Sequence, residues 1–318
     1  MTSKPIAIYY EHPEWFRPLF KELDVRGVNY VKLDASRQSY DPAAANRDFS
    51  LFFNRMSASA YLRGNSSGIF FTHDYLVHLE AAGVRVVNGS RAFGFETSKA
   101  RQLQLLKSLG LSFPNTRVVS CVDEILGAAS QIGFPLLVKP NIGGRGAGIA
   151  RFDSVEQLQG VINKGELQLG IDNVGLVQEL VPARNGRITR VETLGGKFLY
   201  AIDIFTTGEN FNLCPAEICQ VESVAAFLEA KPSDAPDIGL KVEHYTPPQQ
   251  IIDAVERIVA AAQIEVGGVE YIVDDRDGDI VYYDINALSN FVANAPQILG
   301  FDPHVRLVDY LEHEKERA

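Results

Sequence analysis

The sequence predicts an α/β fold whose C-terminal part is α+β. In the first ~90 residues, short apolar stretches alternate with stretches of helical periodicity, which favours an open parallel sheet. Farther along, Gly195-Gly196 separates two apolar stretches and is a direct signal of an antiparallel hairpin. A length of 318 residues suits about two domains. We therefore expect a parallel α/β region followed by a part in which antiparallel strands dominate.

The composition excludes several classes of protein. With 30 Lys and Arg against 40 Asp and Glu, the net charge is −10, and 46% of the residues are hydrophobic against 22% charged, so the chain is not mainly disordered. The acidic balance argues against broad binding to a nucleic-acid backbone. The apolar runs, such as residues 134–138, are far shorter than the roughly 18 residues of a membrane span. We expect neither nucleic acid nor a membrane as a partner.

The N-terminus and the cysteines favour a cytoplasmic protein. The first residues contain one Lys and too few apolar side chains for a signal peptide. Cys121, Cys214 and Cys219 are an odd number in a chain large enough to form its own core, so reduced thiols are the simplest interpretation. We expect a cytoplasmic location and no zinc site at these cysteines.

The N-terminal region is expected to contain strands at residues 6–10, 30–33, 51–53 and 84–87, with helices at 13–22 and from 72 to 83. In open α/β sheets, ligands bind beyond the carboxyl ends of the strands. Asn54 and Arg55 follow the third strand at such an end and are candidates for substrate contacts. An arginine that anchors the loop through a salt bridge is an equally good interpretation.

The central region begins near residues 88–90. A helix is predicted over 97–109, where Leu103, Leu106 and Leu109 recur at helical spacing before Gly110. The further elements expected are, in order, a strand at 117–119, a helix at 122–131, strands at 136–139 and 149–152, a helix at 155–162 and a strand at 175–180.

A glycine-rich loop between two of these strands is a candidate phosphate site. The strand that ends at Lys139 is followed at once by a loop with glycines at 143, 144, 146 and 148. Backbone N–H groups can approach phosphate oxygens closely where side chains are missing, and the lysine supplies charge. No Gly-Lys-Ser/Thr opens a helix here, so this is not a P-loop, and a strand instead of a helix follows, so it is not the dinucleotide pattern. The alternative is a flexible hairpin with a solvated lysine.

The C-terminal region is expected to be largely antiparallel. Its predicted elements are strands at 188–194 and 197–205, a helix from 247 to 262, and a hairpin of strands at 267–273 and 280–287. Residues 206–247 are polar and contain prolines, so we expect a loop excursion with a helix at 221–230 instead of a sheet strand.

The last hairpin carries a candidate metal site. Asp284 and Asn286 share one face because strand side chains alternate. A three-residue loop at 276–278 with Gly278 left-handed would pair Glu270 with Asp284, whereas a two-residue loop would turn Glu270 to the opposite face. Carboxylate and amide oxygens suit Mg²⁺, which is shared with substrate phosphates. The alternative is a solvent-exposed acidic hairpin, which the aspartates at 274, 275, 277 and 279 also fit.

Taken in order, five segments resemble the ATP-grasp superfamily, and most closely its RimK-like carboxylate–amine (amino-acid) ligase branch. The resemblance covers roughly residues 88–310, and it is the order of motifs that carries it. The segments are Asn88-Gly-Ser-Arg-Ala with Ser98-Lys99, Phe134-Pro-Leu-Leu-Val-Lys139-Pro with its glycine loop, Val177-Gln-Glu-Leu-Val181, Gly186-Arg-Ile-Thr-Arg190-Val, and Gly268-Val-Glu270 with Asp284-Ile-Asn286.

The resemblance implies an organisation and a set of site residues. Residues 1–89 would form an N-terminal Rossmann-like pre-ATP-grasp domain, 90–178 the central ATP-grasp lobe and 179–318 the C-terminal lobe. Lys99 and Lys139 would contact the phosphates of ATP, and Arg190 would face the phosphates or the acyl intermediate. The remaining implied residues are the lid residues Gly143, Gly144, Arg145, Gly146 and Gly148, the adenine-binding residues Gln178, Glu179 and Val181, and the ligands Glu270, Asp284 and Asn286 of one or two Mg²⁺ (or Mn²⁺) ions.

The resemblance also implies the reaction. A carboxylate would attack the γ-phosphate of ATP to form an acyl phosphate, which an amine then converts to an amide with release of ADP and phosphate. The substrates would be a small-molecule or peptide carboxylate and amine, with Arg55, Arg190, Asn210 and Asn212 as candidates for their pocket. A homodimer is the commonest symmetric assembly. The alternative function is an ATP-grasp-fold protein that binds nucleotide without ligase chemistry.

Four positions depart from the branch. Ile188 stands where an acidic residue usually contacts the ribose, and a two-residue turn at Gly195-Gly196 would pair it with Asp203 as a replacement. Asp284 stands for the usual Glu, and Ser289-Asn290 for the usual Pro-Gly. Ile202 and Ile204 occupy the return strand where a basic residue is common. These departures concern mainly the substrate end.

Overall fold

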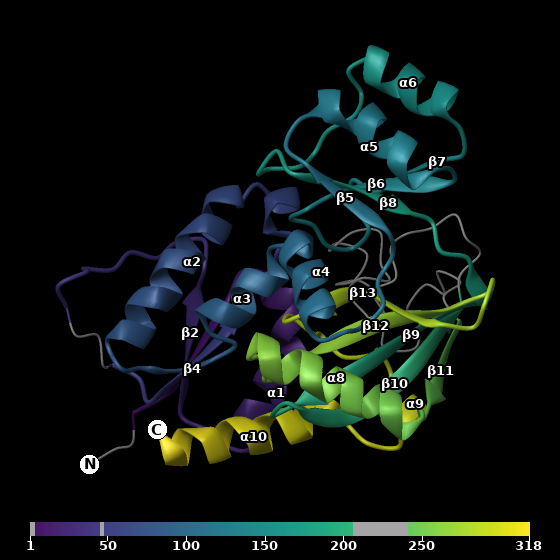
Figure 1. The fold of residues 1–318 in the computed structure, drawn as a ribbon. Coiled ribbons are helices and arrows are strands. Elements are labelled where there is room, and N and C mark those ends of the chain that lie inside the picture. The colour runs from purple at the N-terminus through teal and green to yellow at the C-terminus, as the bar shows by residue number, and fades with distance from the viewer. Residues whose placement is uncertain (1–3, 45–47, 206–240) are drawn as a thin grey trace, which may run out of the picture.

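The fold contains three sheets in a computed structural model that describes residues 4–44, 48–205 and 241–318. Figure 1 shows one sheet in each of three parts of the molecule, with the N-terminal part on the left, the central part at the top and the C-terminal part at the lower right. The helix expected at 221–230, and Asn210, Asn212, Cys214 and Cys219, lie outside the described residues.

The N-terminal sheet is parallel, as predicted. Its strands are β1 (Ile6–Tyr10), β2 (Tyr30–Asp34), β3 (Leu51–Arg55) and β4 (Arg85–Val87), in the order β2-β1-β3-β4. The helices are α1 (Arg17–Val25), preceded by a 3-10 turn at Pro13–Phe16, and α2 (Ser66–Ala81), preceded by one at Ala60–Arg63. The second helix begins earlier than predicted because the Asn65 side chain caps it by accepting from the Gly68 amide.

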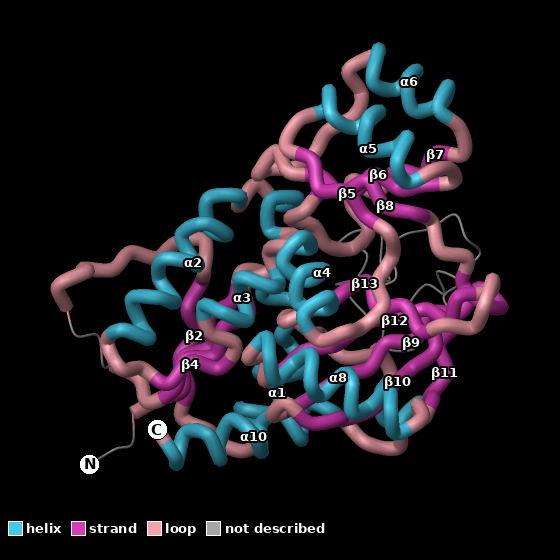
Figure 2. Tube along the Cα trace, in the orientation of Figure 1, coloured by secondary structure: helices cyan, strands magenta, loops and turns pink. Residues whose placement is uncertain are grey.

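The central part is a four-stranded antiparallel sheet. Its order is β5 (Thr116–Val119), β8 (Gly175–Glu179), β6 (Leu136–Pro140) and β7 (Ala150–Phe152). Figure 2 shows α5 (Ile125–Ile132) and α6 (Val155–Asn163) lying together above these strands. The strand after the glycine loop is therefore confirmed, and the loop joins two paired strands.

The helix predicted over 97–109 is confirmed over residues 99–108, and a separate helix that was not predicted precedes it. The chain forms α3 (Ser90–Glu96), turns at Thr97-Ser98 and continues as α4 (Lys99–Ser108). Ser98 is extended, and its hydroxyl accepts from the Arg101 amide, so it ends one helix and caps the next. The break places Lys99 at the first residue of α4, where its amide donates to the Asn141 carbonyl of the central part.

The C-terminal part is a five-stranded antiparallel sheet. Its order is β11 (Lys241–Tyr245), β10 (Lys197–Phe205), β9 (Ala183–Leu194), β12 (Val266–Asp274) and β13 (Ile280–Asn286). The expectation of a loop throughout 206–247 was wrong at its end, because β11 pairs along β10. Three further helices are α8 (Gln249–Ala262), α9 (Ala295–Leu299) and α10 (Pro303–Arg317). Within the described ranges, no helix has the length and apolarity needed to traverse a bilayer.

Both hairpins contain bulges that alter the predicted register. Beyond Gly195-Gly196, an irregularity between Phe198 and Tyr200 places Asp203 opposite Thr189 instead of Ile188, so that expectation was wrong. In the last hairpin, Val273 pairs with Ile280, which a three-residue loop at 276–278 does not produce. A bulge at Tyr283 then brings Glu270 opposite Asp284. The predicted pair is therefore confirmed, although the loop argument for it was wrong.

One face of the C-terminal sheet is apolar, and the other, here called the polar face, carries charged residues beside an apolar cluster that includes Tyr200 and Ile202. Val191, Val269 and Ile285 pack in one buried cluster with residues of α4 and α8. The alternating positions Arg190, Glu270 and Asp284 point to the other side, because successive strand residues face opposite ways.

The N-terminal part packs against this sheet through an apolar contact. Leu19 and Leu23 of α1 share a cluster with Val308 and Leu311 of α10. Beside it, Arg26 Nη1 donates to Asp309 Oδ1 at 2.6 Å. These contacts bring the carboxyl end of the parallel sheet to the polar face of the C-terminal sheet.

We predict that Gly267→Ala will destabilise the protein by about 1–3 kcal/mol, the usual cost of overpacking. A Cβ at Gly267 would lie 2.3 Å from the Asn286 carbonyl oxygen and 2.6 Å from Ile264 Cγ2. Gly160→Ala in α6 is the control, because a Cβ there meets nothing within 4 Å and helix propensity should raise stability by up to ~1 kcal/mol. Urea unfolding measures both, and equal midpoints for wild type and Gly267→Ala would contradict the close approach.

Candidate active site

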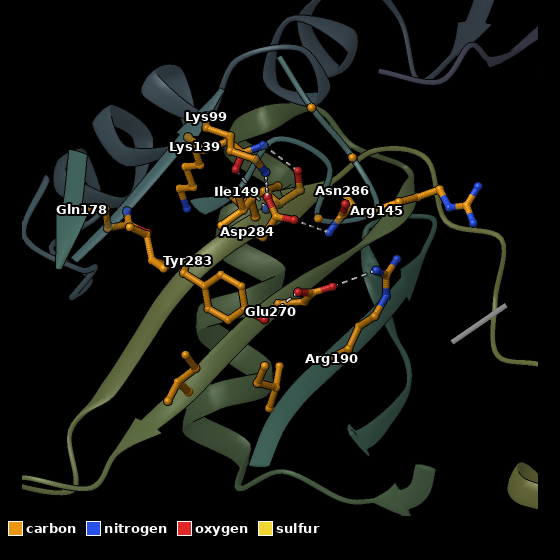
Figure 3. Close-up of a pocket in the computed structure, with 18 of the residues that line it drawn as sticks. Lys99, Lys139, Arg145, Ile149, Gln178, Arg190, Glu270, Tyr283, Asp284 and Asn286 are labelled. Carbon is orange, nitrogen blue, oxygen red and sulfur yellow. Dashed lines mark hydrogen bonds and ion pairs between the residues drawn. The ribbon is translucent and has the colours of Figure 1, made fainter. Parts of the chain in front are cut away.

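The three parts enclose a cavity of about 740 Å³. Its walls come from the N-terminal part, from β6 and the glycine loop, and from the polar face of β9, β12 and β13. Figure 3 shows the labelled side chains spread across this cavity, with Gln178 on one side, Arg145 and Arg190 on the other, and Lys99, Lys139 and Asp284 between them. The predicted site residues that line it are Lys99, Lys139, Gly143, Gly144, Arg145, Gly146, Gln178, Glu179, Val181, Arg190, Glu270, Asp284 and Asn286.

The centre of the cavity holds two facing carboxylates. Glu270 and Asp284 lie opposite each other on β12 and β13. Glu270 accepts from Arg190 Nη1 at 2.9 Å and from the Tyr283 hydroxyl at 2.7 Å, and Asp284 forms an ion pair with Lys99 Nζ. Directly opposed like charges destabilise a strand pair. The cations Lys99 and Arg190 offset that repulsion, which rules out the exposed acidic hairpin.

The two carboxyl groups differ in their ease of protonation. Burial raises the pKa of Glu270, and the charge of Asp284 adds to it while Arg190 opposes it. Burial acts on Asp284 as well, but the ion pair with Lys99 holds the pKa of Asp284 below its usual value. Asp284 is therefore the more firmly ionised of the two and the stronger attractor for a cation.

The donor set of the hairpin fits Mg²⁺. Asn286 Nδ2 lies 3.4 Å from Asp284 Oδ2, so the amide adjoins the carboxylate pair. In the part of the chain that the structure describes, no group of three or more His, Cys, Asp or Glu residues is placed to hold a metal. Two carboxylates and an amide leave coordination positions for water and phosphate oxygens, which is how Mg²⁺ is usually bound.

Lys139 is buried, and the described residues give its ammonium group no partner. It is 5% exposed at the end of β6, and none of the described residues accepts a hydrogen bond from it or forms an ion pair with it. Burial, together with the charge of Lys99, lowers the pKa of Lys139 to about 7. A buried ammonium without a partner is unfavourable. A phosphate in the cavity would supply that partner.

Lys99 interacts across the cavity, not along its own helix. The alternative of an i,i+3 pair with Glu96 is not formed, because Lys99 pairs with Asp284. The Glu96 carboxylate instead accepts from the amides of Ala287 and Leu288, and burial raises the pKa of Glu96 to about 6. Glu96 therefore fixes the segment that follows the metal hairpin.

The glycine loop covers the cavity between β6 and β7. Residues 143–147 line the cavity, whereas Gly148 does not. Gly148 has a φ of +75°, and a Cβ there would lie 3.2 Å from the Pro140 ring, so this glycine serves the closure of the loop. Gly144 approaches the N-terminal part, where a Cβ would lie 3.3 Å from Ser59 Cβ.

On the side of the cavity opposite Arg145, residues 178–183 line it together with apolar side chains of β9 and β12. Gln178 Nε2 donates to Thr116 Oγ1 at 2.8 Å, and Glu179 accepts from the Asn115 amide and from Arg276, so both side chains have partners within the protein. Ile188 and Ile272 pair on adjacent strands and both line the cavity. A flat apolar ring fits such a surface.

Asp203 does not take the place of the missing acidic residue at Ile188. Its carboxylate accepts from the Thr189 hydroxyl at 2.6 Å and from Arg187 at 3.2 Å, and it does not line the cavity. The bulge near Phe198 explains this, because it moves Asp203 one position along β9. The proposed replacement contact was therefore wrong.

Asn54 and Arg55 support the cavity from outside. Neither lines it. Asn54 donates to the Asn88 carbonyl at 3.1 Å and accepts from the Met56 amide at 3.0 Å. The Arg55 guanidinium donates to the Ser289 carbonyl and to Asn290 Oδ1, at 3.3 Å for the latter, and lies between two aromatic rings. Arg55 thus anchors a loop, as the second interpretation of this residue predicted. It does so through a backbone carbonyl and a side-chain amide instead of a salt bridge.

Several cavity residues were missed by the sequence analysis. Tyr283 faces Glu270 only because of the bulge, since strict alternation places it on the other face from Asp284. Glu192 lies two residues beyond Arg190 and accepts from its Nε at 2.6 Å, so the period of two could have indicated it. The rule of strand carboxyl ends could have indicated Ser57 and Ser59. Nothing in the sequence pointed to Trp15 as a lining residue.

Comparison with solved structures identifies the fold. The RimK domain ATP-grasp protein of Sphaerobacter thermophilus superposes with a TM-score of 0.65 over 96% of this chain and 98% of that one, at 17% identity. This chain has the ATP-grasp fold. D-alanine–D-alanine ligase of Bacillus anthracis, complexed with ATP, gives a TM-score of 0.66 over 100% and 98% at 14% identity. The ATP-grasp ligase PsnB, with its minimal precursor, Mg and ADP, gives 0.64 over 99% of both chains at 17% identity.

Sequence comparison finds curated proteins that are similar to part of this chain. No protein-family model matches the chain. The carbamoyl phosphate synthase large chain of Thermotoga neapolitana is 24% identical over 230 residues, 70% of this chain and 19% of that protein. A probable alpha-L-glutamate ligase of Methanococcoides burtonii is 32% identical over 136 residues, 42% of this chain and 44% of that protein. The chain thus spans less than half the length of these curated relatives.

We predict that Lys139→Met will stabilise the nucleotide-free protein at pH 7, and that the advantage will shrink towards pH 9.5. The folded-state pKa of Lys139 is about 7, below its ordinary value of 10.5, so between these values the unfolded chain binds the proton that the folded protein lacks. Stability of the wild type therefore rises with pH in this window. Urea unfolding at both pH values measures the difference. Lys107→Met, at an exposed position of α4, is the control, and an advantage independent of pH would contradict the assignment.

Proposed function

We propose that the chain is an ATP- and Mg²⁺-dependent ligase that joins a carboxylate to an amine through an acyl phosphate and releases ADP and phosphate. The observation that carries the proposal is a cavity in which Lys139, without a partner among the described residues, faces the acidic hairpin beneath a glycine loop. Residues 1–89, 90–178 and 179–318 would be the pre-ATP-grasp domain and the two lobes that enclose ATP.

The similar proteins support this chemistry. Two of those with solved structures are described as ligases, one bound to ATP and the other to Mg and ADP. The sequence relative from Methanococcoides burtonii is described as a probable glutamate ligase. Because their identities to this chain are low, the support for the reaction depends on the residues in its own cavity.

Charge determines the roles of those residues. A carboxylate that attacks ATP brings an anion to an anion, so positive charge must be in place before the bond forms. Glu270, Asp284 and Asn286 would hold Mg²⁺, which when bound neutralises phosphate oxygens. Lys139 would donate to a phosphate and so obtain the partner it lacks. Lys99 can exchange Asp284 for a phosphate once another cation occupies that carboxylate.

Arg190 and the lid would protect the intermediate. Arg190 is 8% exposed and is held by Glu192 and Glu270, which fixes its guanidinium beside the acidic pair. From there it would stabilise negative charge on the acyl phosphate. Residues 143–147 cover the same space, and exclusion of water by a closed loop prevents hydrolysis of such an intermediate.

We predict that the wild type releases ADP in a Mg²⁺-dependent reaction when the right acid and amine are supplied. Lys139→Ala should lower kcat by about 10²- to 10³-fold, the usual effect of removing one group that stabilises charge in the transition state. A screen of amino-acid pairs with ATP, followed by hydroxylamine trapping of the acyl phosphate as a hydroxamate, measures this. Lys107→Ala is the control. Calorimetric binding of Mg·ATP with no ADP release across the panel would instead support a nucleotide-binding protein without ligase chemistry.

We predict that Glu270→Gln and Asp284→Asn will each raise the Mg²⁺ concentration for half-maximal ADP release by roughly tenfold, because each removes one charged oxygen ligand. Asp279→Asn removes an equal charge from the exposed end of the same hairpin and should leave the Mg²⁺ dependence unchanged. A titration of ADP release against Mg²⁺ compares them. Equal shifts in all three variants would indicate a general charge effect and contradict the assigned ligands.

A further inference from the structure

A cluster of cationic and aromatic side chains lies where the lid meets the N-terminal part. Trp15, Ser59 and Arg145 line the same cavity. The His12 ring stacks on Trp15 with 4.9 Å between centroids, and the Arg63 guanidinium lies 4.8 Å from the centre of the indole ring. We call His12, Trp15, Arg63 and Arg145 the lid-contact cluster. Figure 3 places its member Arg145 on the opposite side of the cavity from Gln178.

Three polar atoms of this cluster are buried and have no hydrogen-bond partner among the described residues. They are Trp15 Nε1, His12 Nδ1 and Arg145 Nε. Trp15 is 6% exposed, so its N–H is withheld from bulk water. Two of the three atoms are obligatory donors, and a neutral imidazole can donate from the third. Since buried polar groups are nearly always paired, three of them together indicate a missing acceptor.

The cluster also has one positive charge in excess. Arg63 pairs with Glu11, with contacts of 2.5–3.0 Å, and Arg17 pairs with Glu14 at 2.5 Å. No carboxylate of the described residues pairs with Arg145. Burial, with the charge of Arg63 added, lowers the pKa of the Arg145 guanidinium, and burial lowers the pKa of His12. The missing acceptor is therefore anionic.

Arg145 occupies its place at a conformational cost. Its φ is +58°, in the left-handed region that glycine adopts without strain, and its neighbour Gly146 is in the same region. A loop selected only for flexibility would place glycine here. Strained residues of this kind concentrate at ligand contacts.

We propose that the lid-contact cluster is the receptor for a substrate carboxylate that does not react. The substrate class is an amino acid or a dicarboxylic acid whose non-reacting carboxylate is bound by Arg145 and the indole N–H of Trp15. The planar fork of an arginine matches a carboxylate well. This inference rests on the proposed ligase function, and it makes closure of the lid depend on that substrate, because Arg145 belongs to the lid.

The chain itself supplies a reporter for the test. Trp15 is its only tryptophan, so emission excited where indole absorbs and tyrosine does not reports on this cluster alone. With Mg²⁺ and a non-hydrolysable ATP analogue present, the protein is titrated with L-alanine, L-glutamate, L-lysine and succinate, each against its primary amide. We expect a saturable change in emission with at least one acid, and at least tenfold weaker binding of its amide. No saturable change with any acid, or equal binding of acid and amide, overturns the proposal.

Variants test the role of Arg145 in the same titration. Arg145→Ala should raise the dissociation constant of the acid at least tenfold, and Arg145→Lys, which keeps the charge, should restore part of the affinity. Arg117→Ala removes an equal charge from an exposed position of the same lobe and should bind like wild type. In turnover, Arg145→Ala should raise KM for the acid by a larger factor than KM for ATP. Unchanged affinity in Arg145→Ala overturns the proposal.

The two proposals fail in different ways. Absence of ADP release by the wild type with every substrate pair refutes the ligase function, while the emission titration still decides whether the cluster binds carboxylates. ADP release that is equally fast with an acid and its amide refutes the receptor and leaves the ligase function standing.

Discussion

The site depends on two buried carboxylates that face each other across a strand pair. Glu270 and Asp284 would repel in this position, and removing an ion from water adds to the cost. Lys99 from α4 and Arg190 from β9 contact them and make the arrangement stable. The Lys99 contact ties α4 to β13 and the Arg190 contact ties β9 to β12, so the acidic pair also aligns elements that enclose the cavity.

Much of the fold followed from local patterns, whereas the registers did not. The parallel N-terminal sheet and the strand on each side of the glycine loop depend on periodicity and turn residues, which the sequence displays directly. The bulges near Phe198 and at Tyr283 add one residue to one strand, and packing across the sheet decides where that residue goes. The bulge near Phe198 is why the predicted partner of Asp203 was wrong. The pairing of Glu270 with Asp284 was predicted correctly although the prediction did not include the bulge at Tyr283.

Some residues of the site could likewise be predicted from local sequence patterns, and others could not. Lys139 could be predicted because it stands at the end of a strand next to the glycine loop, and the acidic hairpin because strand alternation places Asp284 and Asn286 on one face. Trp15 could not, because it reaches the cavity only when α1 packs against α10, nearly three hundred residues along the chain. Arg55 was singled out from its strand end, but the aromatic rings of Phe16 and Phe53 enclose it and direct it to a loop. Packing between segments far apart in the sequence thus decides which residues line the cavity.

The partners within the cavity show how it can receive anions at little reorganisation cost. Its central carboxylates already have cationic partners, whereas Lys139 and Arg145 have none among the described residues. A ligand that brings phosphate with a divalent cation, and a carboxylate, would exchange these partners without requiring new charges from the protein. Such preorganisation is favourable for catalysis because dipoles and charges need not move as the reaction proceeds. The unpartnered cations lower the stability of the empty protein, which is a common feature of functional sites.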